Sequence, residues 1–125
     1  MAHTIVGTPY YLSPELCEEK PYNHKSDIWS LGCVLYELCT FKHPFDAKNQ
    51  GSLIMKIVKG QFAPIASHYS PELQELVRQL LLKDYRKRPG IAEILEFSSM
   101  KSRMQLYGYQ ESDQLLTTTM AAGGA

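Results

Sequence analysis

The most hydrophobic segment of the chain runs from Ser26 to about Cys39 and predicts a helix capped by Ser26. Its apolar residues lie on every side of the helical wheel rather than along one stripe: Ile28, Trp29, Leu31, Cys33, Val34, Leu35, Tyr36 and Leu38. A helix that is apolar all round is typical of the interior of a larger protein. We therefore expect that the rest of the chain cannot cover this helix completely, and that an exposed apolar face allows self-association.

Shorter helices are predicted on both sides of this segment. Ser13 and Ser70 each begin the sequence Ser-Pro-Glu-Leu, in which serine suits the N-cap, proline the first turn and glutamate the positive end of the helix dipole. After Ser70 the apolar residues follow a helical period and form one face: Leu73, Leu76, Val77, Leu80 and Leu81. This second segment therefore predicts an amphipathic helix.

Two further helices complete the pattern. One ends near Lys59, where Gly60 suits the C′ position, and a short one follows Pro89. No segment has a convincing strand pattern, so the expected fold class is all-α, an incomplete domain of about five helices. Residues 1–104 are assigned to this partial domain. Residues 105–125, which are polar, Thr-rich and then Ala/Gly, are assigned to a flexible tail.

Composition narrows the function classes. The chain has 125 residues, enough for one domain, and its formal net charge is zero, so we expect no nucleic-acid partner and no anionic membrane surface. Its longest apolar stretch, Ile28 to Leu38, is too short to span a bilayer. The three cysteines form no C-x-x-C pair and, with four scattered histidines, give no zinc spacing. A reducing compartment, cytoplasmic or nuclear, is the expected location.

Two sequence blocks carry a resemblance to a known family. Gly7-Thr8-Pro9-Tyr10-Tyr11-Leu12-Ser13-Pro14-Glu15 resembles the end of a protein kinase activation segment, with the P+1 loop and the A-P-E motif. Asp27-Ile28-Trp29-Ser30-Leu31-Gly32 resembles the D-x-W-x-x-G motif of the helix that follows, and Arg88-Pro89 stands where the family has its arginine. The wording is similar to that of the NIMA-related (Nek) Ser/Thr kinases. The implied fold is the helical part of a kinase C-lobe, over residues 3–104.

The resemblance assigns a role to the residues before the first short helix. Thr4 stands at the family's activating phosphothreonine, and Thr8 at the threonine that contacts the catalytic aspartate and lysine. Together with Thr8, residues Gly7, Pro9 and Tyr10 form the implied P+1 substrate loop. Without the resemblance, Thr4 reads as a solvated surface residue and Thr8 as a turn residue before Pro9.

The resemblance also implies structural residues. Glu15 and Arg88 are the family's buried ion pair, and Asp27, Trp29 and Gly32 anchor the long helix. In the family Asp27 caps amides of the catalytic loop, and Gly32 allows close helix packing. The plainer reading makes Glu15 a helix-dipole acid and Arg88 one member of a basic surface turn.

The chemistry of phosphoryl transfer is not found in this sequence. The Gly-rich loop, the strand lysine, H-R-D and D-F-G are absent, and the family places all of them before residue 1. We therefore expect no catalytic, cofactor-binding or metal-binding residue in this chain, and ATP and Mg²⁺ only in a full-length parent. The chain is therefore predicted to be a fragment of a protein Ser/Thr kinase, namely the part that faces protein substrates. The alternative is a non-catalytic helical module that binds kinase partners or substrates. In-frame H-R-D and D-F-G codons upstream of Met1 would distinguish the two.

Overall fold

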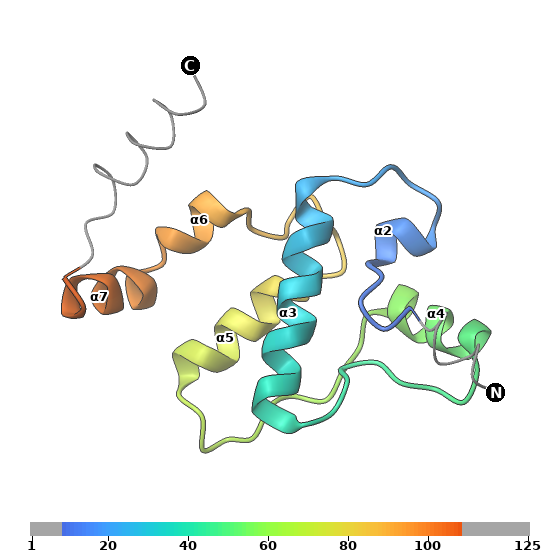
Figure 1. Ribbon diagram of the computed structural model, residues 1–125, viewed down its shortest axis with the longest axis horizontal. Helices are drawn as coiled ribbons and strands as arrows, with labels where there is room; N and C mark the ends of the chain where they lie inside the picture. Colours follow the sequence, from blue (N-terminus) through green and yellow to red (C-terminus); the bar gives the residue numbers. More distant parts are fainter. Residues whose placement is uncertain (1–8, 109–125) are drawn as a thin grey trace. The chain divides into compact units, whose positions relative to one another are not determined.

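The computed structural model describes residues 9–108 (Figure 1). Thr4, Gly7 and Thr8 of the predicted sites lie outside this range. The described part contains six α-helices and no strand, so the all-α fold class is confirmed. The helices are α2 (Pro14–Cys17), α3 (His24–Thr40), α4 (Gln50–Lys59), α5 (Pro71–Leu80), α6 (Ile91–Leu95) and α7 (Ser98–Leu106).

The chain divides after Gly90 into two compact units. In the first unit α2 packs against α4, and α5 packs against α3. The second unit contains α6 and α7, where the sequence predicts one short helix. Phe97 interrupts the helical backbone with an extended ψ of 137°, which separates the two helices. Helix α7 includes Gln105 and Leu106, while residues 109–125 of the predicted tail lie outside the described range.

Helix α3 begins two residues before the predicted cap, so the assignment of Ser26 as N-cap is wrong. Asn23 is the N-cap, and its side-chain Oδ1 accepts a hydrogen bond from the Lys25 backbone N–H at 2.8 Å. The Ser26 hydroxyl occupies the third helical position and accepts from the Asn23 backbone N–H at 3.4 Å. The two residues thus form a capping box, in which Ser26 is the returning partner rather than the cap.

One side of α3 forms the core of the first unit. Trp29, Cys33 and Tyr36 are buried there, and Trp29 stacks on Phe45 with ring centroids 5.5 Å apart. The other buried members of this core come from the segments after α3: Leu53, Ile57, Ile65, Val77 and Leu81. The long helix therefore organises the first unit, and the segments that follow it wrap around one of its sides.

The remaining side of α3 is apolar and uncovered in the described part of the chain. Leu31, Val34 and Leu38 are 47%, 43% and 69% exposed. Their spacing of three and four residues places them along one stripe of the helix, which we call the α3 stripe. Ile28, which the sequence also predicted to be hard to cover, is buried instead.

Candidate functional site

The candidate site begins at Ser13-Pro14-Glu15, where the short helix α2 fixes the direction of Glu15. Ser13 has an extended backbone and Pro14 takes the first helical position, so the helix starts there and Glu15 lies in its first turn. Arg88 follows the turn of residues 84–87, in which the Arg88 backbone N–H donates to the Asp84 carbonyl at 3.1 Å. Two local structures far apart in the sequence thereby present opposite charges to each other.

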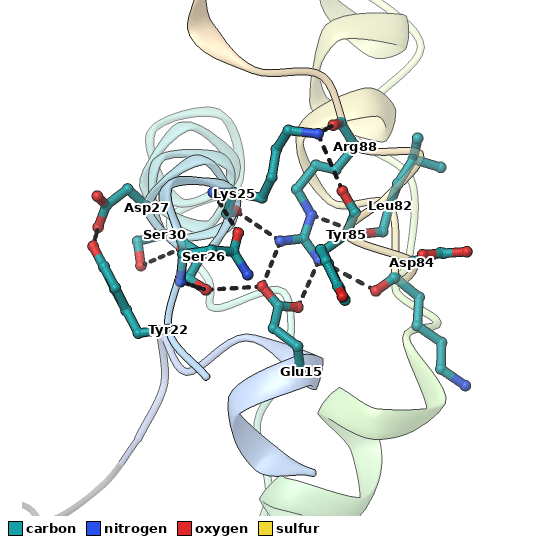
Figure 2. A network of polar contacts seen from close by, with 12 residues as sticks. Glu15, Tyr22, Lys25, Ser26, Asp27, Ser30, Leu82, Asp84, Tyr85 and Arg88 are labelled. Carbon is teal, nitrogen blue, oxygen red and sulfur yellow. Dashed lines mark hydrogen bonds and ion pairs between the residues drawn. The ribbon is translucent and has the colours of Figure 1, made fainter. Parts of the chain in front are cut away.

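Glu15 and Arg88 form a bidentate ion pair, shown in Figure 2. Arg88 Nη1 donates to Glu15 Oε2 at 2.9 Å, and Nη2 donates to Oε1 at 3.0 Å. The two side chains are 0% and 2% exposed. The structure therefore brings together the two residues for which the resemblance implied a pair, and it excludes the surface-turn reading of Arg88.

The remaining N–H groups of Arg88 donate to backbone carbonyls. Its Nη1 donates to Lys25 O at 2.7 Å, its Nε to Leu82 O at 2.9 Å, and its Nη2 to Lys83 O at 3.2 Å. The guanidinium also lies 5.1 Å from the centroid of the Trp29 ring, within cation–π range. A guanidinium has five N–H donors, and all of them are used here.

The pair changes the acidity of Glu15. Burial raises the pKa of this carboxyl. Hydrogen bonds from Arg88, from backbone N–H and from Ser26 lower the pKa by a larger amount, so the net pKa is below its ordinary value of 4.5. The Ser26 hydroxyl donates to Glu15 Oε2 at 2.9 Å. Glu15 is therefore an ionised, fully engaged carboxylate at neutral pH.

Lys25 closes the network from the other side, a role that the sequence did not reveal. Its ammonium donates to the carbonyls of Arg88 at 2.5 Å and Tyr85 at 3.3 Å. Since Arg88 in turn donates to the Lys25 carbonyl, the two residues hold each other's backbone. Lys25 and Ser26 are neighbours in the sequence at the start of α3, but only the fold shows which groups their side chains contact.

Asp27, Trp29 and Gly32 occupy different surroundings on α3. Asp27 is exposed and accepts a hydrogen bond from the Tyr22 hydroxyl (Figure 2). Trp29 is fully buried. At Gly32 an added Cβ would lie 2.8 Å from the Cβ of Leu80, so glycine permits the close approach of α3 and α5.

Of the implied P+1 loop, the structure describes Pro9 and Tyr10. The Tyr10 ring stacks on His43 with centroids 3.8 Å apart and planes 6° from parallel. His43 and Glu37, which contacts it, were not singled out in the sequence. No local pattern points to them, because Tyr10 and His43 are far apart along the chain.

The acidic groups of the described residues form no candidate site for a metal ion. Glu15 is engaged by Arg88 and Ser26, and no cluster of three or more His, Cys, Asp or Glu with metal-binding geometry occurs within residues 9–108. In the same range, no helix has the length and apolar character needed to cross a membrane.

Comparison with known proteins identifies the family of this chain. Residues 1–99 match the protein kinase domain. The chain belongs to the protein kinase family. Within this chain the Glu15–Arg88 pair links α2 to the turn that follows α5.

The relatives of this kinase chain include several Nek enzymes. It is 53% identical over 107 residues to the serine/threonine-protein kinase Nek1 of Mus musculus, covering 86% of this chain and 9% of that protein. It is 52% identical over 107 residues to Nek5 of Homo sapiens, covering 86% of this chain and 15% of the relative. Against Nek8 of Danio rerio the identity is 58% over 94 residues, 75% of this chain and 14% of the relative. The NIMA-related resemblance is thus confirmed, and the chain spans only a small part of each relative's length.

Proposed function

We propose that this chain is the substrate-facing, C-terminal part of a protein Ser/Thr kinase catalytic domain and does not transfer phosphate by itself. The observation that carries the proposal is the buried Glu15–Arg88 pair, which ties the Ser-Pro-Glu segment to the end of the first unit. A planar guanidinium on a carboxylate fixes orientation as well as distance. In this proposal, the segment immediately before Ser13 is the part of the chain that receives the protein substrate.

The proposed substrate loop consists of Gly7, Thr8, Pro9 and Tyr10. Thr8 would contact the catalytic aspartate and lysine supplied by the rest of a kinase domain, and Pro9 and Tyr10 would shape the pocket for the residue after the phosphoacceptor. Thr4 is the proposed activating phosphosite. Phosphate there would add about −1.5 to −2 charges and would order the loop through an arginine from outside this chain.

The complete protein would use ATP and Mg²⁺, act on protein Ser/Thr and work in the cytoplasm or nucleus. This chain contains none of the motifs that hold nucleotide or metal. Because phosphoryl transfer depends almost entirely on positioning and electrostatics, no partial activity is expected without those groups.

The test is reconstitution. The purified chain, alone, should show no ATP–Mg²⁺ binding by calorimetry and no label transfer to casein above a no-protein control. Mixed with a separately made N-terminal part of the Nek1 catalytic domain, it should transfer label. A chain with Leu31→Lys and Leu38→Lys on the α3 stripe is the control that should not reconstitute. Nucleotide binding or label transfer by the chain alone would contradict the proposal.

The second candidate function is a non-catalytic module that binds kinase partners or substrates. The uncovered α3 stripe favours it, since an exposed apolar helix face can dock another protein. The same experiment distinguishes the two, because a module would bind the N-terminal part without producing label transfer.

A further inference from the structure

A cluster of aromatic and acidic side chains holds the loop that precedes α2. Tyr10 and Tyr11 come from this loop, Glu37 from the last turns of α3, and His43 from the connection between α3 and α4. We call these four residues the Tyr10–His43 cluster. None of them belongs to the Glu15–Arg88 network, so the loop has a second anchor independent of the ion pair.

The centre of the cluster is the stack of Tyr10 on His43. A centroid distance of 3.8 Å with planes 6° from parallel means that the two rings overlap almost fully. His43 therefore covers one face of the Tyr10 ring. Tyr11 meets the same imidazole by its edge, with centroids 6.1 Å apart and an angle of 61°. One histidine thus contacts two consecutive loop residues.

Glu37 orients the imidazole. Its Oε1 lies 3.0 Å from His43 Nδ1, and each of the two side chains is only 29% exposed. Interaction with the Glu37 side chain, together with burial, raises the pKa of the Tyr11 hydroxyl to about 12. The carboxylate therefore fixes the ring that stacks on Tyr10 and, at the same time, holds the neighbouring tyrosine.

Backbone contacts complete the support. The Leu12 N–H donates to the Pro9 carbonyl at 3.3 Å, which closes a turn across Tyr10 and Tyr11. The Ser30 hydroxyl of α3 donates to the Tyr11 carbonyl at 3.2 Å. Of the two tyrosines in this turn, Tyr10 is the one that stacks face to face on the ring from the α3–α4 connection.

We propose that His43, oriented by Glu37, is the positioning residue that holds Tyr10 in place for the substrate residue following the phosphoacceptor. The proposal rests on the proposed function of residues 7–10. Loss of the stack leaves Tyr10 free to rotate into the pocket, so peptide binding weakens. Binding of substrate and of transition state weaken alike, which raises KM and leaves kcat unchanged.

Three variants test the assignment. His43→Ala removes both the stack and the Glu37 contact, whereas His43→Phe keeps a ring to stack but loses Nδ1. His68→Ala is the matched control, because His68 also lies against a tyrosine, Tyr69, at 4.3 Å but is remote from the cluster in sequence. Hydrogen exchange of the Leu12 amide is measured on the 125-residue chain, and peptide KM and kcat are measured on the reconstituted kinase.

The expected effect of His43→Ala is a roughly three- to tenfold faster Leu12 exchange and a similar rise in KM, as expected for loss of an aromatic pair. His43→Phe should recover most of both effects, and His68→Ala should change neither. Unchanged Leu12 exchange in His43→Ala overturns the proposal, and so does faster exchange with an unchanged KM. If the unsubstituted mixture has no kinase activity, the proposed function fails and this inference with it. The exchange data then still report whether His43 holds the loop.

Discussion

At the scale of single residues, Arg88 connects more of the chain than any sequence pattern indicates. Its guanidinium bonds the carboxylate of α2, a carbonyl at the start of α3 and two carbonyls after α5. A buried charge is tolerated only when its partners are all in place. Arg88 therefore makes α2, α3 and the turn after α5 depend on one another.

Glu15 and Arg88 should be energetically coupled. Replacing either one alone by alanine leaves a buried charge without its partner, which costs on the order of 3–5 kcal/mol of unfolding free energy. The double variant Glu15→Ala/Arg88→Ala should cost much less than the sum. Urea unfolding at low protein concentration measures all three. Additive losses would mean that the two charges do not stabilise each other in solution.

The same pair predicts a pH dependence of stability. The folded-state pKa of Glu15 is below 4.5, so the unfolded chain binds this proton at a higher pH than the folded chain does. The stabilisation from Glu15 is thus complete above that value and is lost as the pH falls through the folded pKa. Unfolding free energy measured from about pH 6 to about pH 3 should fall.

A Glu15→Gln variant separates this effect from other carboxylates. Glu75 and Asp84 also have lowered pKa values, because of hydrogen bonds from Arg78 and Arg86, and they contribute to the acid loss in both proteins. The variant should lose less stability between neutral and acid pH than the unsubstituted chain. Parallel pH profiles would exclude the assigned role of Glu15.

At the scale of elements, the packing of α3 requires its glycine, whereas the packing of α4 does not. In α3, an added Cβ at Gly32 would meet Leu80 Cβ at 2.8 Å and Leu81 Cδ2 at 2.9 Å. In α4, an added Cβ at Gly51 would meet only Asn49 Oδ1, at an ordinary 3.5 Å. The first glycine is required by the packing of α3 on α5, and the second is not.

Gly32→Ala should therefore destabilise the chain by about 1–3 kcal/mol, because Leu80 Cβ is fixed to the backbone and cannot move aside. Gly51→Ala is the matched control and should stabilise by about 0.5–1 kcal/mol through reduced backbone entropy of the unfolded chain. Thermal unfolding monitored by circular dichroism measures both. A stabilising Gly32→Ala would show that α3 and α5 lie further apart than the structure has them.

At the scale of the whole molecule, the α3 stripe is an apolar surface that the described part of the first unit does not cover. Leu31, Val34 and Leu38 expose apolar surface that water solvates at a cost. The chain alone should be marginally stable, bind a hydrophobic dye and associate as its concentration rises. A separately made N-terminal part of a Nek catalytic domain should relieve all three behaviours.

Charged substitutions on the stripe test this expectation. Leu31→Lys with Leu38→Lys should keep the chain monomeric in sedimentation velocity at concentrations where the unsubstituted chain associates. Met55→Lys is the control, since Met55 is 74% exposed on α4 and lies outside the stripe. A sharp, concentration-independent thermal transition of the unsubstituted monomer would contradict the prediction.

The sequence by itself determined the local elements and the family. The Ser-Pro-Glu-Leu segments begin helices α2 and α5, and Gly60 ends α4 with a φ of 75°. These features depend on neighbouring residues and on backbone preferences, so they can be read without the fold. The ordered kinase motifs identified the partners Glu15 and Arg88, although nothing local connects two residues so far apart.

Only the tertiary structure decided which side of α3 is buried, because a helix that is apolar all round carries no periodic signal to choose one. It also decided the cap of α3: Asn23 and Ser26 are both good capping residues, and the contact of Ser26 with Glu15 fixes their roles. The Tyr10–His43 cluster could not be found in the sequence either. Its contacts join distant segments, and their energy exists only once α3 and its connections have packed around one core.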